Sequence, residues 1–135
     1  MLKVYIADDS VVVREKLKEV LEEQGSIKVI GEAGDAGQAI TEIRKLDPQV
    51  VIIDIRMPKG GGLPVLKDIK ARTPQCIVII LTSFPNHEYR DVYLAAGADY
   101  FFDKTKDIPQ MTSTLVELAS KNGDPHENTF LQAFL

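Results

Sequence analysis

The sequence predicts a single α/β domain in which a five-stranded parallel sheet is covered by helices on both faces. Three observations support this fold class: short runs that are apolar throughout, amphipathic segments between them, and helix-starting or chain-breaking residues at the junctions. Because strands and helices alternate along the chain, each crossover is expected to be right-handed. The expected fold is therefore a doubly wound parallel sheet.

The strands are expected where β-branched or aromatic residues form a short run without polar interruption. The five runs are Val4–Ala7, Ile27–Gly31, Val50–Ile53, Ile77–Leu81 and Tyr100–Phe102. A run that is apolar at successive positions presents apolar side chains to both faces of a sheet. We therefore expect buried strands.

Segments between the strands, and the segment after the last strand, repeat apolar residues at helical spacing, so each is expected to be a helix that buries one face. These sets are Val13, Leu17, Val20 and Leu21, then Ala39, Ile40, Ile43 and Leu46, then Val65, Leu66 and Ile69, and finally Ile108, Met111, Leu115 and Leu118. Asp35 with Gln38 predicts a capped helix start. Pro64 and Pro109 suit the first turn of a helix.

Composition limits the function classes. The 135 residues include 16 Lys and Arg against 20 Asp and Glu, a formal net charge of -4, so we expect no direct nucleic-acid binding by this chain. The one cysteine, Cys76, lies in an apolar run and excludes an internal disulfide. No apolar stretch approaches the roughly 20 residues of a membrane span, and charged residues appear too early for a signal peptide. We expect a cytoplasmic protein without membrane association.

The domain is expected to cover residues 1–121. From Asn122 the sequence turns polar, and from Phe130 to Leu135 it is mostly apolar. We interpret residues 122–135 as a linker and a short tail. Three alternatives stay open for the tail: packing on a neighbouring molecule or partner, a short helix against the domain, or disorder, which is the default for a terminus.

Polar residues follow four of the predicted strands. Asp8 and Asp9 come after the first strand, Asp54 after the third, Thr82 after the fourth and Lys104 after the fifth. Because the carboxyl ends of parallel strands share one edge of the sheet, these side chains are expected to meet there. Singly, each is explained as a helix cap, a turn residue or a solvated charge. Together, the set favours a functional site.

Three carboxylates at one edge repel one another unless a cation lies among them. Mg²⁺, with Mn²⁺ as a substitute, is expected because it takes one or two carboxylates and keeps waters and phosphate oxygens, whereas Ca²⁺ prefers more protein oxygens. A carboxylate beside the metal can act as a nucleophile toward a phosphoryl group, and Asp54 is best placed to do so. The Lys104 ammonium and the Thr82 hydroxyl would contact phosphoryl oxygens.

The segments IADDS, DIRMP, ILTS and GADYFFDKT resemble the signature segments of response-regulator receiver domains. This resemblance extends from Leu2 to about Ser120 and implies a flavodoxin-like (βα)5 fold, as in chemotaxis regulators, with strand order 2-1-3-4-5. It further implies that the Mg²⁺ is held by Asp8, Asp9, Asp54 and the backbone carbonyl of Arg56.

The same resemblance implies the roles of the remaining residues. Asp54 would be the phosphoacceptor, Lys104 the phosphate-contacting lysine, Thr82 the switch hydroxyl and Phe101 the rotating aromatic residue. Movement of Thr82 toward the phosphoryl group would let the Phe101 ring fill the vacated space. The face of helix 4, strand 5 and helix 5 would then change. Phe101 stands where tyrosine is common in the family, so the steric switch remains without the hydroxyl contact.

The partners implied are a sensor histidine kinase or a histidine phosphotransfer protein as phosphoryl donor, and a downstream protein target or effector domain as receptor of the signal. The domain would catalyse its own phosphorylation and dephosphorylation without being an enzyme for another substrate. A homodimer formed on phosphorylation is a further expectation. Arg56 and Phe84, each two residues beyond a functional position, place large side chains where the hydrolytic water would approach. We therefore expect slow autodephosphorylation.

Other function classes explain less of the pattern. A hydrolase of the haloacid-dehalogenase type needs an acid where Arg56 stands, and a flavodoxin-like cofactor binder would have its phosphate repelled by Asp8 and Asp9. Two alternatives stay open: the receiver portion of a longer DNA-binding transcriptional regulator, and a pseudo-receiver that binds proteins without phosphorylation. His87 and His126 are interpreted as surface residues without chemistry.

Overall fold

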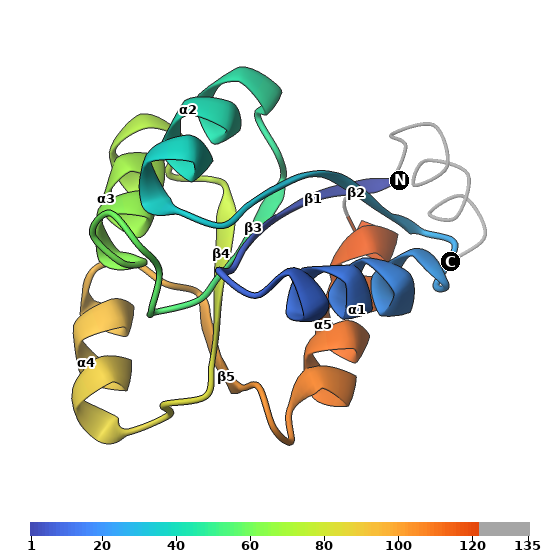
Figure 1. The fold of residues 1–135 in the computed structure, drawn as a ribbon. Helices are drawn as coiled ribbons and strands as arrows, with labels where there is room; N and C mark the ends of the chain where they lie inside the picture. The colour runs from blue at the N-terminus through green and yellow to red at the C-terminus, as the bar shows by residue number, and fades with distance from the viewer. Residues whose placement is uncertain (122–135) are drawn as a thin grey trace.

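The computed structural model describes residues 1–121, in which five strands alternate with five helices (Figure 1). The elements are β1 (Leu2–Ala7), α1 (Val11–Glu22), β2 (Ile27–Ala33), α2 (Ala36–Leu46), β3 (Val50–Ile53), α3 (Leu63–Arg72), β4 (Ile77–Thr82), α4 (His87–Ala95), β5 (Tyr100–Asp103) and α5 (Ile108–Lys121). The predicted linker and tail, with Phe130–Leu135 and His126, lie outside the described residues. The predicted alternation is confirmed.

The strands pair in parallel in the order β2-β1-β3-β4-β5, which confirms the predicted order. The chain first moves outward from β1 to β2 and then returns to β3 on the other side of β1. At such a reversal the crossovers leave in opposite directions, and a crevice opens at the carboxyl ends of the strands. The crevice between β1 and β3 is therefore where a site is expected.

Two layers of helices bury the sheet. In Figure 1, α2, α3 and α4 lie on one side of the sheet, and α1 and α5 lie on the other. Successive residues of β3 are divided between the faces, because Val51 and Ile53 join the first core and Val50 and Ile52 the second. This two-sided burial explains why the strand runs show no polar alternation.

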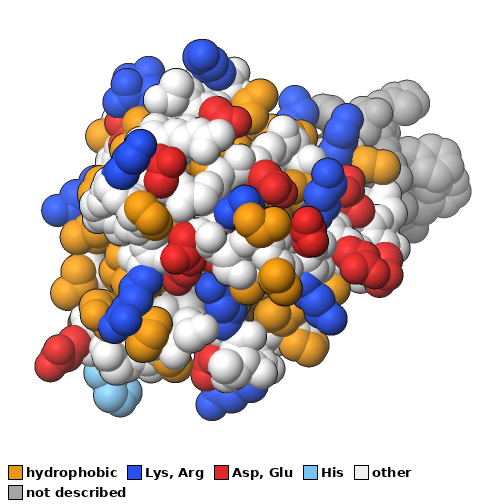
Figure 2. Space-filling model, in the orientation of Figure 1, with side chains coloured by type: hydrophobic (Ala, Val, Ile, Leu, Met, Phe, Trp, Pro, Cys, Tyr) orange, Lys and Arg blue, Asp and Glu red, His pale blue; other side chains and the backbone are white. Residues whose placement is uncertain are grey.

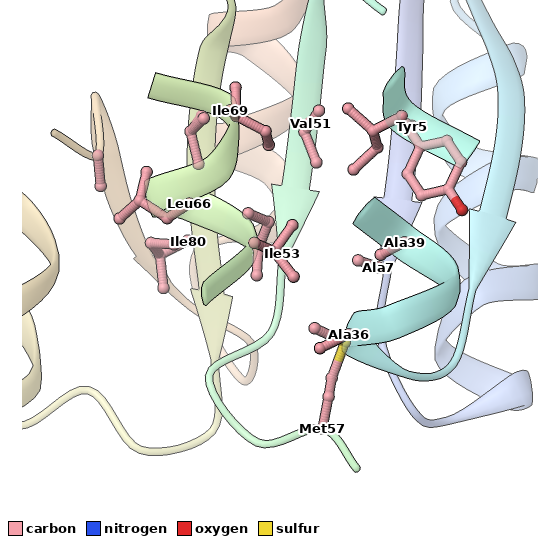
Figure 3. Close-up of a cluster of buried hydrophobic side chains, with 14 of the residues drawn as sticks. Tyr5, Ala7, Ala36, Ala39, Val51, Ile53, Met57, Leu66, Ile69 and Ile80 are labelled. Carbon is pink, nitrogen blue, oxygen red and sulfur yellow. The ribbon is translucent and has the colours of Figure 1, made fainter. Parts of the chain in front are cut away.

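The core beneath α2 and α3 is drawn in Figure 3. Leu66 and Ile69 of α3 belong to the same buried cluster as Ile53 and Ile80 of the strands (Figure 3). On the α2 side the small Ala36 and Ala39 allow the helix to lie close to the sheet, and the larger Ile43 adds apolar contact. The helix spacing read from the sequence thus identified the buried face of α3 and the buried Ala39 and Ile43 of α2. The prediction was wrong for Leu46, which is 40% exposed at the end of α2.

The edge strand β2 departs from the prediction. It continues to Ala33, and most of its middle residues are only half-buried because a strand at the edge has a neighbour on one side. Its register with β1 shifts after Val4, where the Tyr5 ring lies against Gly31: a Cβ at Gly31 would come within 2.8 Å of that ring. The Tyr5 hydroxyl donates to the Glu42 carboxylate of α2 at 3.1 Å.

The helix ends follow the predicted signals. Ser10 caps α1 by accepting a hydrogen bond from the N–H of Val13, and Asp35 caps α2 by accepting one from Gln38. Pro64 and Pro109 each lie in the first turn of a helix, as expected. These caps fix where the loops at the carboxyl edge of the sheet begin and end.

The surface carries charges of both signs. In the view of Figure 2, Lys and Arg side chains are interspersed with Asp and Glu, and that face shows no continuous basic area. Among residues 1–121, none of the helices combines the length and the apolar character needed to cross a bilayer.

Candidate functional site

Three carboxylates gather at the carboxyl edge of the sheet. Asp8, Asp9 and Asp54 each offer an oxygen that lies within 4.8 Å of the others. Asp8 and Asp54 are 2% and 5% exposed, whereas Asp9 is exposed to solvent. The N–H of Asp8 donates to the Ala33 carbonyl at 3.0 Å, and that of Asp54 donates to the Ala7 carbonyl at 2.9 Å. The two buried acids are therefore held by the sheet's own hydrogen-bond ladder.

Lys104 joins this cluster from the start of the β5–α5 loop. Its Nζ lies 2.6 Å from Asp8 Oδ2 and 3.2 Å from Asp54 Oδ2, and its side chain is 12% exposed. The backbone N–H of Lys104 donates to the Thr82 carbonyl at 2.8 Å, which ties the start of the β5–α5 loop to the end of β4. One ammonium facing three carboxylates leaves an excess of negative charge, so the cluster suits an additional cation.

The pKa of Asp54 is raised. Burial is the main cause, and the neighbouring Asp8 charge adds to it, while Lys104 and the Arg56 N–H act in the opposite direction. For Lys104, burial lowers the pKa, but Asp8 and Asp54 together raise it further, so the net shift is upward. An isolated ion pair would lower the pKa of its acid. The upward shift at Asp54 thus means that burial, together with the Asp8 charge, outweighs the neighbouring Lys104 ammonium.

The donor set fits a small, hard cation. Asp8 uses Oδ1 to accept the N–H of Ser10 at 2.9 Å, and within residues 1–121 the Asp9 carboxylate has no hydrogen-bond or ion-pair partner. Carboxylate oxygens grouped at a solvent-facing edge are the ligands preferred by Mg²⁺. The backbone N–H of Arg56 donates to Asp54 Oδ1 at 3.4 Å, so the Arg56 backbone lies beside these carboxylates.

Thr82 lies next to Lys104 at the end of β4, and Phe101 lies on the neighbouring strand β5. Thr82 is fully buried at the end of β4, and its hydroxyl accepts a hydrogen bond from the N–H of Phe84 at 3.0 Å. Phe101 pairs with Ile80 across β4 and β5 and packs, half-buried, against the core under α2, α3 and α4. The Thr82 hydroxyl is thus engaged with the β4–α4 loop.

Arg56 and Phe84 make a contact that sequence reasoning did not predict. The guanidinium carbon of Arg56 lies 3.6 Å from the centroid of the Phe84 ring. A stack of this kind at an exposed position contributes about 0.5–1 kcal/mol. It joins the β3–α3 loop, which follows Asp54, to the β4–α4 loop, which follows Thr82.

The β3–α3 loop packs closely on the end of β3, beside Asp54. A Cβ at Gly62 would lie 2.6 Å from the carbonyl oxygen of Asp54 and 3.3 Å from the hydroxyl of Tyr93. Tyr93 of α4 is buried, and its pKa is raised by that burial and by the charge of Asp54. Sequence reasoning gave Tyr93 no role, because a single aromatic residue in a helix does not reveal which loop it contacts.

A hollow of about 230 Å³ opens beside Lys104, between α1 and the loops that follow β4 and β5. Its lining includes Val12, Val13 and Leu17 of α1 and Ile108 at the start of α5. The other apolar residues of α5 that were expected to be buried do pack against the core. Val12, at the rim, is 75% exposed.

Sequence reasoning also gave no role to Arg14, which reaches the acid cluster's backbone. The guanidinium donates to the carbonyl of Asp8. One sequence signal was available: Arg14 lies three and seven residues before Leu17 and Leu21, so it shares the buried face of α1. By contrast, His87 starts α4 as an exposed residue, in agreement with the prediction.

Comparison with known proteins gives consistent matches. The family model for the response regulator receiver domain matches residues 4–116. The DNA-binding transcriptional activator DevR/DosR of Mycobacterium tuberculosis is 35% identical over 112 residues, which cover 82% of this chain and 50% of that protein. The protein-glutamate methylesterase/protein-glutamine glutaminase of Pseudoalteromonas atlantica is 40% identical over 108 residues, covering 78% of this chain and 28% of that protein. The chain thus spans half or less of these relatives.

Solved structures resemble the fold over most of its length. The response regulator domain of Thermotoga maritima CheB has a TM-score of 0.78 at 29% identity, covering 93% of this chain and 99% of that one. The isolated REC domain of RcsB from Salmonella enterica, solved with the phosphomimetic BeF3-, has a TM-score of 0.77 at 30% identity, covering 86% and 88%.

Proposed function

The chain belongs to the response regulator receiver domains, which are signalling switches of two-component systems, and we propose that it accepts a phosphoryl group on Asp54 in a Mg²⁺-dependent reaction. The main support is the cluster of Asp8, Asp9 and Asp54 with Lys104 at the carboxyl edge of the sheet. It combines a buried carboxylate nucleophile, spare cation ligands and an ammonium group for phosphoryl oxygens.

Asp8, Asp9, Asp54 and the carbonyl of Arg56 would hold the Mg²⁺, with Mn²⁺ as a substitute. Bound there, the ion would neutralise negative charge that develops on the transferring group. An Asp54 oxygen would form the new bond to phosphorus, while the bond from phosphorus to the donor's histidine nitrogen breaks and that nitrogen keeps the electron pair. Lys104 would turn from Asp54 toward a phosphoryl oxygen. Its raised pKa keeps it protonated for this role.

The switch would begin at Thr82. Rotation of its hydroxyl toward a phosphoryl oxygen would release the Phe84 N–H that it now accepts from. The β4–α4 loop would then be free to shift, and the Phe101 ring could move into the space left by Thr82. The surface formed by α4, β5 and α5 would change as a result, and a downstream protein target, an effector domain or a second copy of the chain would bind it.

The phosphoryl donor would be a sensor histidine kinase or a histidine phosphotransfer protein. The apolar hollow beside Lys104, with the exposed Val12 at its rim, offers a docking surface next to the reacting carboxylate. We place this exchange in the cytoplasm, with no direct role for nucleic acid or membrane. The division into a receiver over residues 1–121 and a linker with a tail over residues 122–135 stays a prediction.

A second candidate is supported by the relatives. Because the chain spans half or less of the DNA-binding activator and the methylesterase, it would equally serve as the receiver portion of a longer regulator. In that case the effector would be another part of the same protein.

The test is phosphorylation by acetyl phosphate, followed by intact mass with and without Mg²⁺. The wild type is expected to gain one phosphoryl group only with the metal, and Asp54→Ala none. Asp91→Ala, which removes an exposed carboxylate from α4, is the control and should behave as the wild type. A folded wild type that binds Mg²⁺ but gains no mass would instead favour a pseudo-receiver that binds proteins without phosphorylation.

A further inference from the structure

Arg14 connects three segments at the carboxyl edge of the sheet. Its Nη1 donates to the backbone carbonyl of Asp8 at 2.6 Å, and its Nε lies 3.3 Å from Glu32 Oε1 on β2. The Arg14 side chain is only 14% exposed. A guanidinium is suited to this arrangement because its planar donors can hold two acceptors in a fixed geometry.

The bonded carbonyl belongs to the peptide that joins Asp8 to Asp9. The other contacts of Asp8 act elsewhere: its N–H belongs to the preceding peptide and pairs with Ala33, and its side chain pairs with Ser10 and Lys104. Within residues 1–121, Arg14 is therefore the group that fixes the orientation of the Asp8–Asp9 peptide. That orientation decides where the exposed Asp9 carboxylate points.

The loop after β2 leaves room for this contact. A Cβ at Gly34 would lie 3.0 Å from Arg14 Nη1 and 3.8 Å from the carbonyl oxygen of Asp8. Any larger residue at Gly34 would therefore crowd the guanidinium against the carbonyl it binds. A side chain at Gly34 would therefore require the Arg14 guanidinium to move by a few tenths of an ångström.

We propose that Arg14 is a positioning residue for the cation site, which orients the Asp8–Asp9 peptide so that the Asp9 carboxylate can bind the metal together with Asp8 and Asp54. The inference rests on the proposed function, because it takes these acids as the Mg²⁺ ligands. Groups that orient metal ligands typically change metal affinity by 10- to 100-fold when they are removed.

Two effects of Arg14 on the cation have opposite signs, and this makes the proposal testable. Its positive charge repels a cation, so removal of the charge alone would tighten Mg²⁺ binding. Its hydrogen bond to Asp8 orients a ligand, so removal of that bond would weaken binding. We expect the second effect to be larger, because Glu32 already offsets part of the charge.

The experiment measures Mg²⁺ affinity of the unphosphorylated full chain by titration calorimetry, with unfolding in chelator as the record of stability. Arg14→Met is expected to weaken Mg²⁺ binding by about 10-fold. Arg14→Lys keeps the charge but cannot hold both acceptors, so it should fall between Arg14→Met and the wild type. Glu32→Gln removes the ion pair and leaves the Asp8 contact, so its affinity should stay within about threefold of the wild type.

Gly34→Ala is the second variant, which displaces the guanidinium without removing it and should also weaken Mg²⁺ binding. Unchanged or tighter binding in folded Arg14→Met would overturn the proposal, as would an equal loss in Glu32→Gln. If Arg14→Met does not fold, wild-type affinity in both Arg14→Lys and Gly34→Ala overturns it instead. A wild type that binds no Mg²⁺ would contradict the proposed function itself, which is a separate outcome.

Discussion

Two largely buried lysines lie at the two ends of the parallel strands: one at their amino ends, the amino edge, and one at their carboxyl ends, the carboxyl edge. The surroundings of the two lysines differ. At the amino edge, Lys70 of α3 donates to the Cys76 carbonyl at 2.6 Å and to Asp99 Oδ2 at 2.9 Å. Asp99 also accepts the N–H of Val78 at 2.8 Å. Here one lysine faces one carboxylate, and backbone groups complete the hydrogen bonds of both.

At the carboxyl edge, Lys104 faces Asp8 and Asp54, and Asp9 lies close by. The charges do not balance, and the hydrogen-bond capacity of Asp9 is unused among residues 1–121. A buried lysine whose charge and donors are satisfied, as at Lys70, is explained by stability alone. One shared among several acids, as at Lys104, is a candidate for a functional role.

The largest expected effect is on phosphorylation by acetyl phosphate. Lys104→Met should slow phosphoryl gain by about 100-fold, because a charged donor aimed at the transferring group is lost. Lys70→Met, the matched change at the other edge, should leave the rate within about twofold of the wild type, because no reacting atom is near it. Time-resolved intact mass would measure both. Equal loss in the two variants would remove the distinction between the edges.

At the amino edge the expected effect is on stability. Lys70→Met should lower the free energy of unfolding by about 2 kcal/mol, because Asp99 and the Cys76 carbonyl lose a charged donor. Urea unfolding in chelator would measure this loss. A variant as stable as the wild type would mean that water replaces the lysine at this edge.

The contact between Arg56 and Phe84 gives a third test. The Arg56–Phe84 stack lies across two loops of the carboxyl edge, and we expect it to slow the approach of the hydrolytic water. Replacing the pair by Arg56→Asn with Phe84→Glu should shorten the phosphoryl lifetime by about 10-fold, or about 1.4 kcal/mol of barrier. Decay of the phosphorylated mass after desalting would measure it. An unchanged lifetime would refute the expected slow autodephosphorylation.

The smallest effect is a pH dependence. Burial raises the pKa of Asp54 above its ordinary value of 3.8, so the folded form binds this proton more tightly than the unfolded form. The associated stability is present below that ordinary value and is lost as the pH rises through the raised pKa. Asp54→Asn removes the effect, so its stability relative to the wild type should increase with pH across this window.

The measurement is unfolding in chelator at several pH values. Asp99→Asn serves as the contrast, because this carboxylate is a satisfied partner at the amino edge, and its loss should destabilise the fold by about 1–2 kcal/mol at neutral pH. A constant difference between Asp54→Asn and the wild type would argue against a perturbed carboxyl at the site.

The positions of Asp8, Asp54 and Lys104 could be predicted because one rule connects sequence to space: parallel strands end at the same edge. The apolar period likewise predicted α1, α2, α3 and α5 and most of their buried residues, but it gave no set for α4 and was wrong for the exposed Leu46. The contacts of Arg14 and the stack of Arg56 on Phe84 could not be predicted, since each depends on side chains from different segments meeting in three dimensions. The half-exposed β2 was missed because an apolar run does not tell which strand lies at the edge.

The backbone bonds of Asp8 and Asp54 have a consequence for folding. Their N–H groups donate to Ala33 and Ala7, so both acids are part of the ladder that joins the three neighbouring strands β2, β1 and β3. We expect the Asp54 amide, bonded to the inner strand β1, to exchange with deuterated solvent only when the centre of the sheet opens, and the Asp8 amide when the edge strand β2 separates from β1. The backbone of the acid cluster would then keep its place while outer helices fray.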